Sequence, residues 1–148
     1  MAMSIFAELQ SGITTTSEEE THRVARDLAH ALPPECTLAL SGDLGAGKTT
    51  FVRRLARAWA VRNPMTSPSY TLCNLYRGDR LLVHVDAYRL STPDAWESLM
   101  IEDFLRAPWC IAVEWPEHVV PALPLDALWL RFEIATGGNR TITSGASG

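Results

Sequence analysis

The sequence predicts an α/β sandwich with a mixed, mostly parallel central sheet flanked by helices. Short apolar runs typical of buried strands alternate with longer amphipathic segments typical of helices. Two apolar runs joined by a tight Gly-containing connection indicate a hairpin, which adds an antiparallel part to the sheet. The 148 residues are 47% apolar and 20% charged, with a formal net charge of −4, which is typical of one globular domain rather than of a disordered chain.

The first part of the chain predicts two strand–helix units joined through a Gly-rich loop. Ser17 precedes three glutamates at capping-box spacing, and Pro33 and Pro34 stop the helix that follows. The expected elements are a strand over 13–17 that ends in the cap, a helix from there to Leu32, a strand over 36–41, a loop over 42–47 and a helix over 48–60. The solvated face of the last helix is expected to carry Arg53, Arg54 and Arg57.

The rest of the chain predicts more strands and fewer helices. The expected elements are a loop over 63–69, a hairpin of strands over 70–76 and 81–85, a helix from Thr92 toward Leu105, a strand over 109–113, a Pro-rich loop or short helix, a strand over 127–135, a last edge strand over 140–143 and a frayed tail over 144–148. No linker or repeat divides the chain, so residues 1–148 are expected to form a single domain.

A phosphate-binding motif carries the strongest functional signal. Gly42–Thr49 (GDLGAGKT) matches G-x-x-x-x-G-K-[ST], between an apolar strand and a helix, as the mechanism requires. The glycines let backbone N–H groups converge on anionic oxygens at the positive end of the helix. Lys48, the only lysine in the chain, would reach the β- and γ-phosphates, and the Thr49 hydroxyl would bind Mg²⁺. The sequence therefore predicts a P-loop NTPase sandwich that binds a nucleotide with Mg²⁺.

Two carboxylates are candidates to complete such a site. Asp86 and Glu114 each end an apolar strand, and parallel strands end at the same edge of the sheet as the phosphate loop. One acid would hold Mg²⁺ and the other would orient water, and the residues themselves leave open which does which. The expected catalytic residues are thus Lys48, Asp86 and Glu114, whereas His84 is expected to be a core imidazole.

Composition and missing motifs exclude several other functions. The acidic balance argues against direct nucleic-acid recognition, and no apolar run is long enough to cross a membrane. The three cysteines, Cys36, Cys73 and Cys110, lie far apart, which argues against disulfides, and each lies in an apolar run, which predicts buried thiols. A cytoplasmic location follows. The guanine-specific N-K-x-D motif is absent. The alternatives to an ATPase are a P-loop kinase for a small metabolite and a nucleotide-dependent switch module without significant turnover.

Four segments, in this order and spacing, resemble one family over nearly the whole chain. They are Gly42–Thr50 (GDLGAGKTT), Ser67–Leu72 (SPSYTL), His84–Leu90 (HVDAYRL) and Glu114–Glu117 (EWPE). The chain is similar to the TsaE family, also called YjeE, of small bacterial ATPases that are needed for the threonylcarbamoyladenosine modification of tRNA. The resemblance implies slow ATP hydrolysis with Mg²⁺ in support of the TsaB–TsaD heterodimer, and contact with tRNA only through that complex.

The resemblance also implies roles for individual residues. Mg²⁺ would be held by Thr49 and Glu114, which leaves Asp86 as a carboxylate that orients water or acts on the ion without binding it directly. The nucleotide would be bound by Gly45, Ala46, Gly47, Lys48, Thr49 and Thr50, and bordered by Glu18 and Arg140. A switch-like loop would contain Ser67 and Ser69, and Trp115 would lie beside the metal-binding acid. The family usually has Thr at position 69 and Gly at position 100, and Met100 in this chain argues against a tight turn there.

Overall fold

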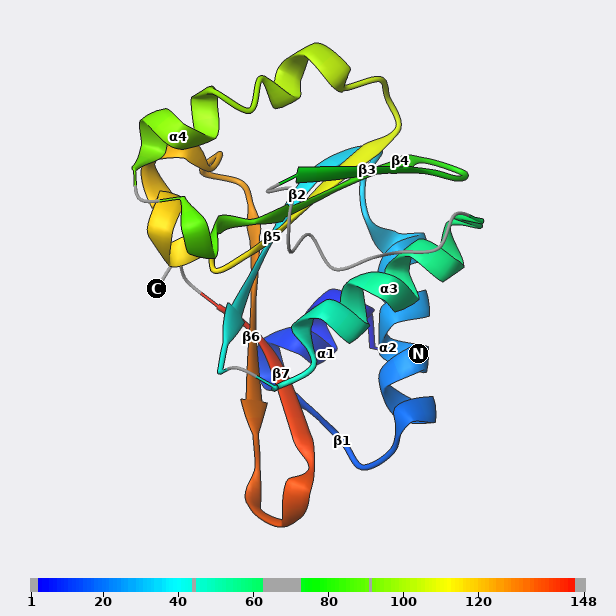
Figure 1. The fold of residues 1–148 in the computed structure, drawn as a ribbon. Coiled ribbons are helices and arrows are strands. Elements are labelled where there is room, and N and C mark those ends of the chain that lie inside the picture. The colour runs from blue at the N-terminus through cyan, green and yellow to red at the C-terminus, as the bar shows by residue number, and fades with distance from the viewer. Residues whose placement is uncertain (1–2, 44, 63–72, 91, 146–148) are drawn as a thin grey trace.

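The computed structural model describes residues 3–43, 45–62, 73–90 and 92–145, which form one seven-stranded sheet with helices on both faces (Figure 1). The α-helices are α1 (Ile5–Ser11), α2 (Glu18–Ala31), α3 (Lys48–Ala58) and α4 (Pro93–Glu97). The strands are β1 (Ile13–Thr15), β2 (Glu35–Gly42), β3 (Cys73–Arg77), β4 (Leu81–Asp86), β5 (Trp109–Glu114), β6 (Leu128–Ile134) and β7 (Arg140–Gly145). Short 3-10 helices are η1 (Ala87–Arg89), η2 (Ile101–Phe104), η3 (Pro116–Ala122) and η4 (Thr136–Gly138).

The strand order in the sheet is β1-β7-β6-β2-β5-β4-β3. The central strand β2 pairs in parallel with β5 and β6, and β4 pairs in parallel with β5, whereas β3 and β7 run antiparallel to their neighbours. Five of the seven strands therefore run in one direction, which confirms the mixed, mostly parallel sheet. The carboxyl ends of β2, β4 and β5 meet at one edge, where a ligand site is expected in this kind of fold.

Each face of the sheet has its own hydrophobic core. The core under α1, α2 and α3 is built around Leu28, Leu40 and Phe51. The other core lies under α4 and the 3-10 helices η1 to η3, and includes Val83 and Val113. Figure 1 accordingly shows α3 and α4 on opposite sides of the strands β4 and β5. The strands that end at the candidate site are thus packed on both faces, which fixes their positions.

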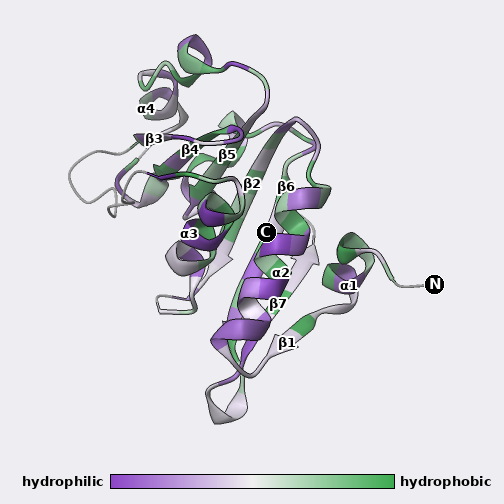
Figure 2. Ribbon diagram, turned by 90° about the vertical axis from the view of Figure 1, so that its right-hand side faces the viewer, coloured by the Kyte–Doolittle hydropathy of each residue, from purple (hydrophilic) through white to green (hydrophobic). Residues whose placement is uncertain are grey.

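The predicted capping signals explain where α2 begins. The Ser17 hydroxyl accepts a hydrogen bond from the backbone N–H of Glu20 at 3.2 Å, and the Glu20 carboxylate accepts one from the backbone N–H of Thr16 at 2.8 Å. The buried side chains of α2 recur at helical spacing and are Val24, Ala25, Leu28 and Ala29. Much of the remaining α2 ribbon is hydrophilic and faces the viewer in Figure 2. The expected amphipathic helix after Ser17 is confirmed.

The expected helix from Thr92 toward Leu105 is wrong in its extent. The helix α4 ends at Glu97, and Met100 then takes a left-handed backbone conformation with φ +53° before η2 begins. A left-handed residue interrupts the helical hydrogen-bond pattern. The expectation that Met100 argues against a tight turn is also wrong, because the turn is present and the exposed Met100 side chain lies outside the core.

The end of the chain also differs from the sequence prediction. The last strand, β7, is not an edge strand, since it pairs with β6 on one side and with β1 on the other. It continues past Thr143, with Ser144 opposite Leu130 and Gly145 opposite Trp129, so the tail predicted over 144–148 is wrong for these two residues. Residues 146–148 lie outside the described residues, as do the loop predicted over 63–69 and the start of the strand predicted over 70–76.

Three further findings concern the N-terminal segment, the cysteines and the helices. The helix α1 was not predicted, and its N-cap is Ser4, whose hydroxyl accepts a hydrogen bond from the backbone N–H of Ala7 at 3.1 Å. The prediction of buried thiols is correct for Cys110 but wrong for Cys36 and Cys73, which are half-buried free cysteines. In the parts of the chain that the structure describes, no helix has the length and apolar character needed to cross a membrane.

Candidate functional site

The Gly-rich loop between β2 and α3 turns through left-handed backbone conformations. Gly42 has φ +133°, Gly45 has φ +81° and Gly47, which caps α3, has φ +101°. A Cβ atom at Gly42 would collide with the carbonyl oxygen of Phe132, whereas Cβ atoms at Gly45 and Gly47 would meet nothing within 4 Å. The loop therefore needs glycine for its path, and it leaves open space beside the N-terminus of α3, where backbone N–H groups attract anions.

Lys48 is the first residue of α3, and its side chain folds back over this loop. Its Nζ donates a hydrogen bond to the Gly42 carbonyl oxygen at 2.6 Å and lies 4.0 Å from the ring centroid of Trp115. Burial lowers the pKa of Lys48, while the negative charge of Glu114 and of other nearby acids acts in the opposite direction. The ammonium group is thus only partly compensated, which favours binding of an additional anion.

Glu114 ends β5 and lies almost fully buried against α3. The Thr49 hydroxyl donates to its carboxylate, with 2.8 Å to Oε1 and 3.0 Å to Oε2, and His84 Nε2 lies 2.5 Å from Oε2. Burial alone would raise the pKa of Glu114, but the hydrogen bonds from His84 and Thr49 and the positive charge of Lys48 lower it below its usual value. A buried carboxylate is therefore kept ionised beside the phosphate-binding loop.

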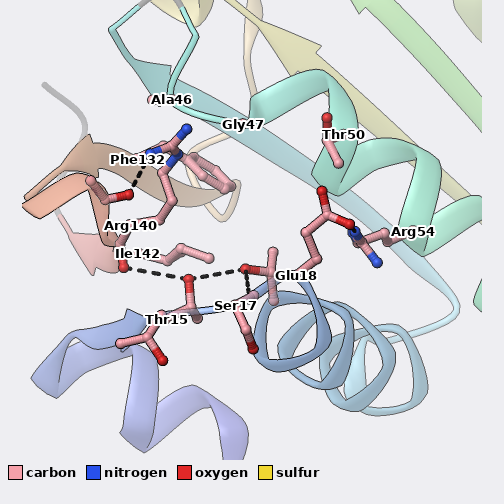
Figure 3. Close-up of a pocket in the computed structure, with 13 residues that line it drawn as sticks. Thr15, Ser17, Glu18, Ala46, Gly47, Thr50, Arg54, Phe132, Arg140 and Ile142 are labelled. Atoms are coloured by element: carbon pink, nitrogen blue, oxygen red, sulfur yellow. Dashed lines mark hydrogen bonds and ion pairs between the residues drawn. The ribbon is translucent and has the colours of Figure 1, made fainter.

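Two neighbouring cavities open along the loop. The smaller has a volume of about 190 Å³ and is lined by Gly45, Gly47, Lys48, Thr49, Thr50, Glu114 and Trp115. The larger has a volume of about 290 Å³ and runs from the loop to α2 and β7, with Glu18, Arg54, Phe132, Arg140 and Ile142 among its lining residues (Figure 3). Gly47 and Thr50 line both cavities, so together these form one continuous site along the N-terminus of α3.

Thr49 and Glu114 have the chemistry that a Mg²⁺ ion requires. Mg²⁺ prefers octahedral oxygen ligands at 2.0–2.1 Å, so that neighbouring ligand oxygens lie about 2.9 Å apart. The oxygens of Thr49 and Glu114 are separated by 2.8 and 3.0 Å. Among the described residues, no group of three or more His, Cys, Asp or Glu side chains could hold a metal ion. An ion at Thr49 and Glu114 would therefore need phosphate and water oxygens as its remaining ligands, as is usual for Mg²⁺ at nucleotide sites.

The structure brings most of the predicted site residues together. All the predicted nucleotide-binding residues line one of the two cavities, and the predicted metal ligands Thr49 and Glu114 are in contact. Asp86 lies opposite Glu114 in the register of β4 and β5. Its carboxylate accepts from the backbone N–H of Tyr88 at 3.0 Å, and neither cavity wall includes it in the described structure. The roles of these residues stay predictions, and Ser67 and Ser69 lie outside the described residues.

Arg54 is a site residue that the sequence pattern did not single out. The expected solvated face of α3 is correct for Arg53 and Arg57, but Arg54 is half-buried and lines the larger cavity. Figure 3 shows Arg54 and Glu18 pointing toward one another from α3 and α2, and their charged groups lie 3.7 Å apart. Helical spacing contained the signal, because Arg54 lies one turn after Thr50 and hence on the same side of α3.

His84 was expected in the core, and this is confirmed, since its side chain has no exposed surface. Its contact with Glu114 was not predicted. The signal was available in the strand pattern, because alternate residues share a face and His84 lies two residues before Asp86. An imidazole on that face, next to the strand that ends in Glu114, can reach the Glu114 carboxylate.

A glycine loop at the carboxyl edge of a mostly parallel sheet, with Lys48 and Thr49 opening the next helix, defines a P-loop protein. Comparison with known sequences shows to which family of P-loop proteins the chain belongs. The model of the family described as threonylcarbamoyl adenosine biosynthesis protein TsaE matches residues 15–142, and the chain belongs to this family.

Individual relatives agree with the family model. The chain is 41% identical over 117 residues to a tRNA threonylcarbamoyladenosine biosynthesis protein TsaE from Aquifex aeolicus, covering 77% of this chain and 83% of the relative. It is 42% identical over 118 residues to a protein of the same name from Streptomyces coelicolor, covering 77% and 79% of the two chains. The crystal structure of YdiB from Bacillus subtilis is similar in fold, with a TM-score of 0.70, 33% identity and coverage of 93% of this chain and 85% of YdiB.

Proposed function

We propose that this protein binds ATP with Mg²⁺ and hydrolyses it slowly in the biosynthesis of threonylcarbamoyladenosine in tRNA. The role in that biosynthesis follows from the family and from the names of the relatives. The observation that supports the ATPase is the cluster at the start of α3, where Lys48 closes over the glycine loop and Thr49 contacts Glu114. These groups offer a cation for phosphates and an oxygen pair for Mg²⁺ beside two connected cavities that together lie in the size range of ligand pockets.

The two cavities suggest how the nucleotide lies. Its phosphates would occupy the smaller cavity, where the N–H groups of the loop and Lys48 oppose their charge. The base and ribose would occupy the larger cavity, which has an apolar side formed by Phe132 and Ile142 and polar groups on Glu18 and Arg140. This division accounts for cavity residues that come from segments as distant in sequence as α2 and β7.

Each residue of the smaller cavity has a proposed part in hydrolysis. Lys48 would hold the β- and γ-phosphates and stabilise the charge that develops as the bond to the γ-phosphate breaks. Thr49 and Glu114 would hold Mg²⁺, which neutralises the phosphate oxygens when it is bound. Asp86, at the neighbouring strand end opposite Glu114, would orient the attacking water.

The partners of the reaction are also part of the proposal. The family resemblance implies that the protein acts on the TsaB–TsaD heterodimer, resetting it between turnovers, and meets tRNA only within that complex. Ser67 and Ser69 would belong to the loop that senses the γ-phosphate. The site of action would be the cytoplasm, where tRNA modification takes place.

Measuring ATP hydrolysis with and without TsaB–TsaD tests this function. We expect slow phosphate release from the protein alone and faster release when the heterodimer is added. Lys48→Met should weaken ATP binding by about 10–100-fold, because it removes hydrogen bonds from a charged donor. It should leave the fold intact, since burial already disfavours the charged amine. Arg53→Met is the matched control, because Arg53 is exposed on α3 and lines neither cavity in the described structure.

Three results would contradict the proposal. Undiminished ATP binding by Lys48→Met would contradict the proposed role of Lys48 in phosphate binding. A rate of ATP hydrolysis that does not change when TsaB–TsaD is added would contradict the proposed partner. A phosphorylated metabolite formed by the protein alone would instead identify a kinase.

A further inference from the structure

His84 is a buried polar residue whose contact lies at the proposed metal site rather than in the core packing. It sits within β4, its side chain has no exposed surface, and its Nε2 is 2.5 Å from Glu114 Oε2. We propose that His84 is a positioning residue that fixes the Glu114 carboxylate for Mg²⁺ binding. This inference rests on the proposed function, because it assigns His84 a part in the Mg²⁺ site of that function.

The register of the sheet explains how His84 reaches Glu114. On β4, His84 pairs with Ala112 of β5, and Asp86 pairs with Glu114. Alternate residues of a strand share a face, so His84 and Glu114 lie on the same side of the sheet, displaced by two residues along it. The imidazole therefore approaches the carboxylate from the neighbouring strand β4, whereas the Thr49 hydroxyl approaches it from α3.

The two contacts together determine the rotation of the carboxylate. A carboxylate on a glutamate side chain turns easily, because the last torsion of this side chain has a broad energy profile. Thr49 contacts both oxygens, and this contact alone is compatible with exchange of Oε1 and Oε2. The hydrogen bond from His84 goes to Oε2, which directs Oε1 and the free lone pairs toward Thr49 and the smaller cavity. Groups that orient metal ligands in this way commonly raise metal affinity.

The chemistry of the imidazole supports a role beyond packing. A carboxylate can only accept hydrogen bonds, so Nε2 of His84 must carry the proton that is shared with Glu114. The other ring nitrogen, Nδ1, is buried and has no hydrogen-bond partner in the described part of the chain. A leucine would fill the same space without leaving a buried polar atom unsatisfied. Packing alone therefore does not explain a histidine at this position, because Nδ1 is left without a hydrogen bond, whereas the contact of Nε2 with Glu114 does explain it.

Mg²⁺ binding, measured without turnover, tests the role of His84. Mn²⁺ replaces Mg²⁺ and is titrated against the protein and ADP, with free Mn²⁺ followed by its electron paramagnetic resonance signal. We expect His84→Leu to weaken metal binding by about 10–100-fold, the usual effect of removing a partner of a metal ligand. ADP binding in EDTA should stay within about threefold of the wild type, because phosphate contacts alone do not involve His84.

Two conservative variants make the test specific for the hydrogen bond. A glutamine amide can place its nitrogen near the position of the imidazole Nε2, so His84→Gln should restore metal binding to within about threefold of the wild type. The shorter His84→Asn reaches only the position of Nδ1 and should bind metal as weakly as His84→Leu. If His84→Leu does not fold, the comparison of His84→Gln with His84→Asn decides the question by itself. In Glu114→Gln, adding His84→Leu should weaken metal binding no further.

The outcomes separate this inference from the proposed function. Metal binding by His84→Leu or His84→Asn that equals the wild type would overturn the positioning role and leave the ATPase proposal intact. Equal losses in His84→Gln and His84→Asn would also overturn it, since they would show a need for the ring rather than for the donor. A wild-type protein that binds ADP without any dependence on the metal would contradict the Mg²⁺ site itself.

Discussion

Glu114 shows how a single buried carboxylate can couple the site to the stability of the fold. Its ionised form is favoured by donors on two elements, His84 on β4 and Thr49 on α3. The pKa of Glu114 in the folded protein therefore lies below its value in the unfolded chain. Because the unfolded chain binds a proton at higher pH than the folded protein does, ionised Glu114 stabilises the fold.

This coupling predicts a pH-dependent difference between the wild type and Glu114→Gln in the absence of metal. Above the unfolded-state pKa near 4.5 the wild type should have the larger free energy of unfolding, by about 1 kcal/mol or more. The advantage should shrink as the pH falls below this value and vanish once the pH passes the lower folded-state pKa. Urea unfolding of both proteins from pH 7 downward measures the difference, and an advantage that is constant over this range would contradict the assignment.

At the scale of single residues, the sequence predicted the site better than it predicted the contacts within it. The motif identified Lys48 and Thr49 because the chemistry of phosphate binding prescribes residue types at fixed spacing. The contacts of Glu114 with His84, and of Arg54 with Glu18, join segments that are distant in sequence. Residue spacing places His84 on the same face as Asp86 and Arg54 on the same side as Thr50, but the partner of each side chain depends on sheet register and helix placement, which the residue pattern does not contain.

At the scale of elements, the junction of β2 and the phosphate loop depends on Gly42. This residue has φ +133° and pairs with Phe132 of β6, so a side chain would meet both an unfavourable backbone conformation and the neighbouring strand. Gly42→Ala should lower the free energy of unfolding by about 2–5 kcal/mol, as strain and overpacking add. Gly138→Ala is the matched control, since Gly138 has φ +83° with nothing within 4 Å of its Cβ position, and should lose only about 1 kcal/mol. Equal losses in urea unfolding would show that the close approach of Phe132 does not matter.

The elements that the sequence predicted correctly are those with strong local signals. Capping residues and apolar periodicity located α2, and a continuous apolar run located β5. The errors arose where tertiary contacts override local pattern. Strand β7 is internal because β1, a strand of only three residues, pairs along its outer side. The helix α4, which packs against η3, ends early, and the left-handed Met100 separates it from η2.

At the scale of the whole molecule, the proposed nucleotide would join two parts of the sheet that no single element connects. The smaller cavity belongs to the phosphate loop and β5, whereas the larger cavity reaches the start of α2 and the strand β7 at the other side (Figure 3). A ligand that fills both cavities should stabilise both regions at once. At a concentration 100 times its dissociation constant, it would add about 2.7 kcal/mol to the free energy of unfolding.

Amide hydrogen exchange with and without ADP and Mg²⁺ measures this distribution. We expect slower exchange not only over 45–50 but also at the start of α2 and along β7 near Arg140, where lining residues would lose contact with water. Amides of α4 that exchange by local opening should keep their rates, because α4 packs on the opposite face of the sheet and lines neither cavity. Protection confined to the phosphate loop would mean that the larger cavity does not hold the base and ribose. Protection that reached α2 and β7 but was lost in Arg140→Ala would instead place the nucleotide across both halves of the sheet.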